Sequence, residues 1–143
     1  MNNLAKVLRA QGDLDAARAL LESALDTMKR QLGPQHPYTL ACLHNLAETL
    51  RAQGGIATAR PMLAQALEAR QQVLGPRHPD TTVSAGVLWE TLYTLGEAEA
   101  AETIAAEHLQ WLLEADEATL AADQRKVRAQ LQQRLGTARV QAR

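Results

Sequence analysis

Apolar residues recur at intervals of three and four along most of this chain. Between residues 40 and 50 they are Leu40, Leu43, Leu46, Ala47 and Leu50. This spacing places all five on one face of an α-helix. A longer run of the same kind follows, made up of Ile56, Ala59, Met62, Leu63, Ala66, Leu67, Val73 and Leu74. The pattern predicts pairs of amphipathic helices and gives no signal for β-strands.

The helix pairs repeat with a constant period. Gly12, Gly54 and Gly96 are 42 residues apart, and each follows a shorter apolar segment and precedes a longer one. We therefore expect three helix–turn–helix repeats, at about residues 1–39, 40–81 and 82–114, each turning at its glycine. A period of this length is typical of stacked repeat proteins, which usually act through an extended surface.

A second recurrent block separates the repeats. The sequence LGPQHPYT at residues 32–39 returns as LGPRHPDT at residues 74–81. Its glycine favours the left-handed conformation that ends a helix, and the first proline prevents continuation. The second proline keeps the preceding histidine extended, and Thr39 or Thr81 is the expected N-cap of the next helix. The block is therefore interpreted as punctuation between helices, although it carries a repeated histidine.

The C-terminal part of the chain departs from this pattern, because no such block follows residue 114. The apolar face of the next segment consists of Leu120, Val127, Leu131 and Leu135. Residues 117–135 are therefore predicted to form a capping helix with one apolar and one polar side, as the end of a repeat array requires. We expect a repeat domain over residues 1–136 with about seven helices, followed by a flexible tail over residues 137–143.

Composition narrows the class of protein further. The 143 residues are rich in Ala, Leu, Glu, Gln and Arg, the net charge is about −1, and there is one cysteine. These residue types favour helices. The charge gives no field that would attract nucleic acid or an anionic membrane, and no apolar run is long enough to span a bilayer. A single cysteine excludes an internal disulfide and fits no metal-ligand motif. These features favour a cytoplasmic protein with no nucleic-acid or membrane partner.

The placement of small residues distinguishes between repeat families. In the pattern NLAxxLxxQGxxxxA, Ala5 and Ala47 are the small residues before the glycine turn, and Ala17 and Ala59 recur after it. This arrangement resembles the tetratricopeptide repeat. The 42-residue period, the NLA start and the LGPxHPxT linker resemble the subtype found in kinesin light chains and many bacterial repeat proteins. The resemblance covers about residues 1–114. It implies an all-α, right-handed solenoid of three repeats plus the capping helix.

Two departures from the repeat pattern carry structural expectations. Trp89 occupies the position held by Ala5 and Ala47. We expect its indole to push the helices of the third repeat apart or to turn aside into a gap. The first helix is also about a turn shorter than its counterparts, so its open end is expected to pair with another copy or to be one part of a longer array.

The resemblance also implies a function. In tetratricopeptide arrays the first helices of successive repeats line a concave groove that takes an extended peptide or partner helix. The residues that would face this groove are Asn3, Lys6, Arg9, His44, Asn45, Glu48, Arg51, Glu90 and Tyr93. Asn3 and Asn45 are the strongest candidates, because a carboxamide can both donate to and accept from a peptide backbone. Their rival role is to hold neighbouring helices together. Lys6, Arg9 and Arg51 would suit an acidic partner, but the interleaved Glu48 and Glu90 leave the sign of the groove open.

The sequence therefore predicts a protein-binding scaffold or adaptor rather than an enzyme. It contains no Ser–His–Asp set, paired carboxylates, phosphate loop or HExxH motif, so no catalytic, cofactor or metal site is predicted. Two alternatives remain: a self-association module that docks through its truncated first repeat, or the repeat portion of a larger signalling or enzymatic protein.

Overall fold

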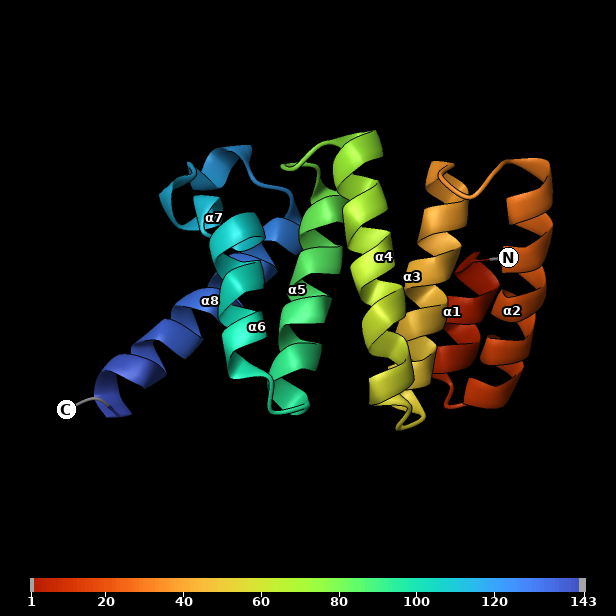
Figure 1. Ribbon diagram of the computed structural model, residues 1–143, viewed down its shortest axis with the longest axis horizontal. Helices are drawn as coiled ribbons and strands as arrows, with labels where there is room; N and C mark the ends of the chain where they lie inside the picture. The colour runs from red at the N-terminus through yellow and green to blue at the C-terminus, as the bar shows by residue number, and fades with distance from the viewer. Residues whose placement is uncertain (1, 142–143) are drawn as a thin grey trace. The chain divides into compact units, whose positions relative to one another are not determined.

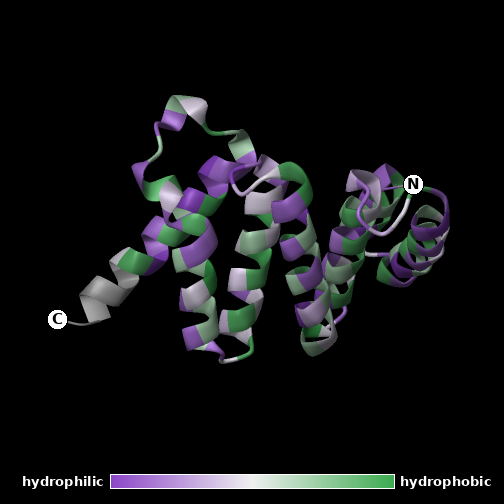
Figure 2. Cartoon of the chain, turned by 45° about the horizontal axis from the view of Figure 1, so that its top comes forward, coloured by the Kyte–Doolittle hydropathy of each residue, from purple (hydrophilic) through white to green (hydrophobic). Residues whose placement is uncertain are grey.

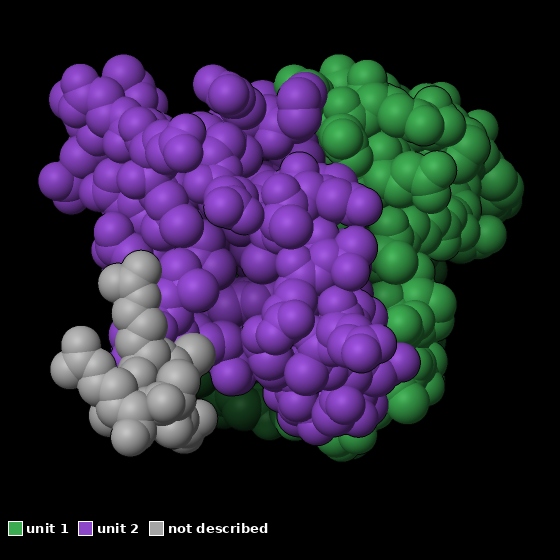
Figure 3. All heavy atoms as spheres, turned by 60° about the vertical axis from the view of Figure 1, so that its left-hand side comes forward, with its two compact units in different colours: residues 1–75 green, residues 76–143 purple. Residues whose placement is uncertain are grey.

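The computed structural model describes residues 2–141, with side chains for residues 2–136. The described chain is helical throughout and contains no β-strand. It divides into two compact units, Met1–Gly75 and Pro76–Arg143, which we call the N-terminal and C-terminal units (Figure 3). None of the helices in residues 2–141 combines the length and the apolarity needed to cross a membrane.

The N-terminal unit consists of four helices, α1 (Asn2–Ala10), α2 (Leu14–Gln31), α3 (Pro37–Ala52) and α4 (Ile56–Leu74). Consecutive helices run antiparallel, and α3 packs against α1, α2 and α4 (Figure 1). The turns after α1 and α3 contain Gly12 and Gly54 with φ of 85° and 91°, a conformation that favours glycine. Ala17, Ala47 and Ala59 are fully buried. The small residues of the repeat therefore lie where the helices approach most closely.

The C-terminal unit contains α5 (Pro79–Thr94), α6 (Ala98–Ile104), a π-helical turn (Ala105–Leu109), α7 (Trp111–Glu114), a 3₁₀ turn (Glu117–Thr119) and α8 (Ala122–Gln141). Sequence analysis expected one continuous second helix in the third repeat. The π turn breaks that helix into α6 and α7, so residues 2–141 contain eight α-helices where about seven were expected. In each unit, hydrophobic residues alternate with hydrophilic ones at helical spacing (Figure 2).

The last helix differs in its bounds from the expected 117–135. The Asp116 carboxylate accepts a hydrogen bond from the Ala118 backbone N–H at 3.1 Å, which forms the 3₁₀ turn and delays the start of α8 to Ala122. The backbone of α8 then continues past Gly136 to Gln141, because a single glycine weakens a helix without preventing it. Of the expected tail, residues 142 and 143 lie outside the described residues.

The N-caps of α3 and α5 correct the prediction for the repeated block. The caps are His36 and His78, not Thr39 and Thr81: the imidazole Nδ1 atoms accept hydrogen bonds from the backbone N–H of Tyr38 at 3.1 Å and of Asp80 at 3.0 Å. Both histidines are extended, as expected before proline, with φ/ψ of −64°/139° and −64°/140°. Each proline then becomes the first helical residue, which moves the helix start two residues ahead of the threonine.

Candidate functional site

Four basic side chains converge on one buried histidine in the N-terminal unit. His44 lies on α3 and is 4% exposed. The positive charges that act on it come from Lys6 and Arg9 on α1, Arg51 on α3 and Arg70 on α4. We call these four residues the basic cluster. Three different helices therefore direct cations toward one region, although they are far apart in the sequence.

Burial and the basic cluster together keep His44 uncharged. Desolvation is the larger cause and the cations the smaller one, and together they lower the pKa of His44 to about 3. Its Nε2 atom lies 3.7 Å from Glu48 Oε2, which is too long for a hydrogen bond. At neutral pH, His44 is therefore a neutral polar group close to the basic cluster.

Glu48 is an acidic residue in this region, and it forms an ion pair with Arg9 of the basic cluster. Its Oε2 atom lies 3.2 Å from Nη1 of Arg9, and both side chains are about a quarter exposed. This ion pair joins α1 to α3 beside the other members of the basic cluster. The sign of the groove as a whole stays open, as the sequence left it.

The two asparagines predicted to read a peptide backbone differ in exposure. Asn3 is exposed on α1, whereas Asn45 on α3 is 6% exposed. The backbone carbonyl of Asn45 accepts a hydrogen bond from Thr49 Oγ1 at 2.9 Å. Its carboxamide makes no hydrogen bond within the described residues. The role of both asparagines in peptide contact stays a prediction.

The remaining predicted residues lie on α5 in the C-terminal unit. Glu90 is partly buried. The ring of Tyr93 is covered by the guanidinium of Arg134 from α8 at 3.5 Å, and it makes an edge contact with Trp89 at 5.7 Å between ring centroids. Tyr93 is thus held by contacts within its own unit, and its place in a peptide groove stays a prediction.

Sequence reasoning missed Arg70, which is 5% exposed in α4. The signal was present in the repeat register. The equivalent positions, 42 residues earlier and later, hold Met28 and Leu112, and Leu112 is fully buried. A charged residue at a position that is otherwise apolar indicates a special polar environment.

The described residues offer little for catalysis or metal binding. Among them, no group of three or more His, Cys, Asp and Glu side chains is placed to hold a metal ion. Cys42 is fully buried, its Sγ donates to the Leu21 carbonyl at 3.4 Å, and burial raises the pKa of its thiol. Since the thiolate is the reactive form, this cysteine is inert.

The antiparallel helix pairs that turn at Gly12, Gly54 and Gly96 define a helical repeat protein. Two overlapping segments, residues 1–72 and 48–118, match the family model described as Tetratricopeptide repeat. These matches cover most of the chain, so the protein belongs to the tetratricopeptide repeat family. Repeats of this family generally mediate protein–protein interactions.

Two solved structures share the fold. BtubC (BKLC) from P. vanneervenii has a TM-score of 0.76 and 19% identity over 87% of this chain and 49% of its own. A protein from Podosopora anserina, described as a candidate kinesin light chain with nearly identical TPR-like repeats, has a TM-score of 0.74 and 22% identity over 85% of this chain and 58% of its own. The chain thus spans about half the length of these relatives. No curated protein sequence matches it.

The family-model match confirms the tetratricopeptide assignment, and the two solved structures, one of them described as a candidate kinesin light chain, share the all-α solenoid fold that the sequence predicted. At these identities the structural similarity establishes the fold alone. What the relatives bind is therefore no guide to the partner of this chain.

Proposed function

We propose that the chain is a non-catalytic scaffold that binds an acidic protein segment on the surface of α1 and α3 in the N-terminal unit. The observation that carries this proposal is that four basic side chains from α1, α3 and α4 act electrostatically on one residue, His44, beside the Arg9–Glu48 ion pair between α1 and α3. Cations that are partly buried attract an opposite charge more strongly than cations in open solvent.

Charge complementarity would supply the attraction, and the asparagines would supply the register. Asn3 is exposed and can bond to the backbone of an extended segment. Asn45 offers much less surface, so we assign it the smaller share of the contact. Glu48 would orient Arg9 and limit how acidic the bound segment can be at that point.

The test is binding of a fluorescent acidic peptide library by fluorescence anisotropy at several salt concentrations. We expect affinity to fall as salt rises, because the attraction is between screened charges. Arg51→Glu should weaken binding about tenfold or more, since it reverses one charge in the cluster, and Asn45→Ala should weaken it about threefold. Circular dichroism must show unchanged helicity in both variants.

A matched control is Arg18→Glu on α2. Arg18 is exposed and its partner in the described contacts is Glu22, one turn along the same helix, at 2.9 Å. It changes net charge as Arg51→Glu does but lies outside the basic cluster. Equal losses for Arg18→Glu and Arg51→Glu, or unchanged binding in both Asn45→Ala and Arg51→Glu, would contradict the proposal.

A second candidate function is self-association through α1, which one observation favours. Leu4 and Val7 are 54% and 50% exposed, whereas their equivalents Leu46 and Thr49, 42 residues later, are 5% and 0% exposed. The same face that packs in α3 is thus bare in α1. Sedimentation equilibrium tests this candidate: we expect association that Leu4→Lys abolishes, and a monomer at all concentrations would refute it.

A further inference from the structure

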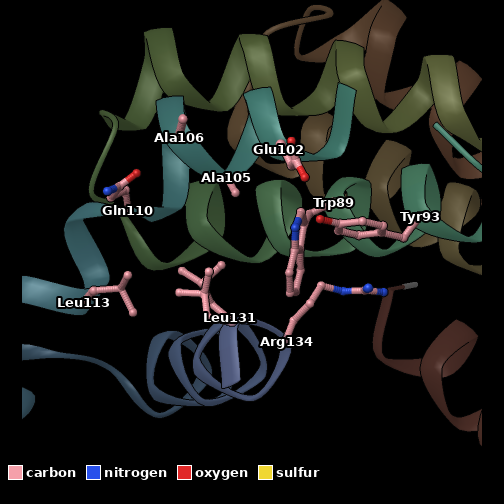
Figure 4. A pocket seen from close by; sticks show the side chains of 10 residues that line it. Trp89, Tyr93, Glu102, Ala105, Ala106, Gln110, Leu113, Leu131 and Arg134 are labelled. Carbon is pink, nitrogen blue, oxygen red and sulfur yellow. The ribbon is translucent and has the colours of Figure 1, made fainter. Parts of the chain in front are cut away.

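The C-terminal unit contains a cavity of about 270 Å³ that the basic cluster does not involve. It lies between α5, α6, the π turn and α8 (Figure 4). The cavity is partly open to solvent. The residues that line it are Trp89, Tyr93, Glu102, Ala105, Ala106, Gln110, Leu113, Leu131, Arg134 and Leu135.

The cavity arises from an exchange of large and small residues between repeats. Where the second repeat has Ala47 and Leu63, both fully buried, the third repeat has Trp89 and Ala105. Ala105 also begins the π turn, in which the Gln110 backbone N–H donates to the Ala105 carbonyl at 2.9 Å. A π turn widens a helix locally and is frequent at functional sites. The wider turn and the short Ala105 side chain leave a cavity at whose wall Trp89 lies, itself only 3% exposed.

Two opposite charges border this apolar space. Arg134 is anchored by stacking, with its guanidinium 3.5 Å from the centroid of the Tyr93 ring and 5.7 Å from that of Trp89. Glu102 lies on α6 across the cavity (Figure 4). Neither side chain has an ion-pair partner among the residues whose side chains are described. The lining therefore offers one anion, one cation and an aromatic wall.

We propose that this cavity binds a small zwitterionic aromatic molecule, of the chemical class of a free aromatic amino acid. Its ring would lie in the apolar part of the cavity between Leu113 and Leu131, next to the small exposed part of Trp89. Its carboxylate would bond to Arg134 and its ammonium to Glu102. An apolar cavity of about 150 Å³ takes one benzene ring, so this larger and half-open space suits a one- or two-ring ligand with its charged end at the mouth.

The experiment compares four probes with the same ring: L-tryptophan, tryptamine, indole-3-acetate and indole. Binding to the ¹⁵N-labelled chain is followed by NMR through the indole N–H of Trp89. Trp111 is an internal reference, because its Nε1–H is engaged by the His108 carbonyl at 2.9 Å and it does not line the cavity. We expect L-tryptophan to bind with a Kd on the order of 0.1–1 mM, as its size allows, and about tenfold more tightly than indole.

Two variants separate the charges. Arg134→Gln should weaken the binding of L-tryptophan and of indole-3-acetate about fivefold or more, and it should leave the binding of tryptamine unchanged. Glu102→Gln should weaken the binding of L-tryptophan and of tryptamine, and it should leave the binding of indole-3-acetate unchanged. Ala106→Leu narrows the mouth from an exposed position and should weaken all four probes. Lys126→Ala is the control, since it removes an exposed charge from α8 away from the cavity.

Several results would overturn this proposal. If none of the four probes shifts the Trp89 resonance at millimolar concentration, the cavity is only a packing defect. If indole binds as tightly as L-tryptophan, the two charges play no part. Loss of binding in Lys126→Ala equal to that in Arg134→Gln would show a nonspecific charge effect.

Discussion

The helix pairs α3–α4 and α5–α6 occupy the same register of the repeat but place their large residue on opposite helices. In the N-terminal unit Ala47 on α3 accompanies Leu63 on α4, and α4 is a regular helix. In the C-terminal unit Trp89 on α5 accompanies Ala105, and the second helix contains a π turn. A pair of helices thus accommodates a bulky residue on one helix when the equivalent residue on the other helix is small and that helix contains a π turn. The residual mismatch is the cavity beside Trp89.

The largest expected effect is in Trp89→Ala. Trp89 is 3% exposed, and truncating a buried tryptophan removes its packing and enlarges the cavity, which should lower the free energy of unfolding by about 3–5 kcal/mol. Urea denaturation followed by circular dichroism measures this. Tyr38→Ala, at a side chain 65% exposed, is the control and should cost under about 0.5 kcal/mol. A loss below about 1 kcal/mol for Trp89→Ala would mean that the indole contributes little packing.

The second prediction introduces the Trp–Ala pair of the third repeat at the equivalent positions of the N-terminal unit. Ala47→Trp should lower the free energy of unfolding by about 1–3 kcal/mol or more, because α4 is a regular helix and Leu63 already occupies the space between α3 and α4. Adding Leu63→Ala should cost less than the two single changes together, since it recreates the Trp–Ala pair of the C-terminal unit. A double-mutant cycle in urea gives the coupling energy. If the losses in free energy of unfolding were strictly additive, the two side chains would not compete for the same space.

Much of the fold could be predicted because local rules and repeat register agree. The glycine turns, the helix pairs and the capping helix follow from hydrophobic spacing and from Gly12, Gly54 and Gly96, whose positive φ suits glycine. The π turn could not be predicted, since the sequence of Ala105–Leu109 is equally compatible with an α-helix. The histidine caps were missed because threonine is the commoner capping residue.

The candidate site was less predictable than the fold. Arg9 and Glu48 could be assigned to one face, but their ion pair at 3.2 Å depends on how α1 packs on α3. The burial of Asn45 and the contribution of Arg70 both depend on tertiary packing, which spacing along one helix does not report. Burial of a polar residue is set by its neighbours in the fold, so residue type alone could not give the exposure of Asn45.

The third prediction concerns His44, which is matched in the C-terminal unit by Gly86. The groups that face His44 are Lys6, Arg9, Glu48, Arg51 and Arg70. Because the pKa is lowered to about 3, the unfolded chain takes up a proton near pH 6.5 that the folded chain does not. Stability should therefore fall as pH drops from 6.5 to 5, with about 1.5 kcal/mol of that loss due to His44. His44→Gln should remove this share, and an unchanged slope would refute it.

The smallest expected effects concern the caps, which are nearly identical in the two units. His36→Ala and His78→Ala should each cost about 1 kcal/mol, because each leaves a helix N-terminal N–H without its acceptor. His36→Ala should cost slightly more, since it also removes a ring contact with Tyr38 at 5.1 Å. Asparagine at either position should retain most of the stability, as its side chain also caps helices.

Thr39→Val decides between the histidine cap and the threonine cap that the sequence favoured. Thr39 is 1% exposed, and its Oγ1 atom has no hydrogen-bond partner within the described residues. If His36 is the cap, replacing this buried hydroxyl by a methyl group should be neutral or stabilising in thermal and urea denaturation. A cost of about 1 kcal/mol for Thr39→Val, with none for His36→Ala, would instead return the cap to threonine. The paired variants Thr81→Val and His78→Ala repeat the test in the other unit, where the same geometry requires the same outcome.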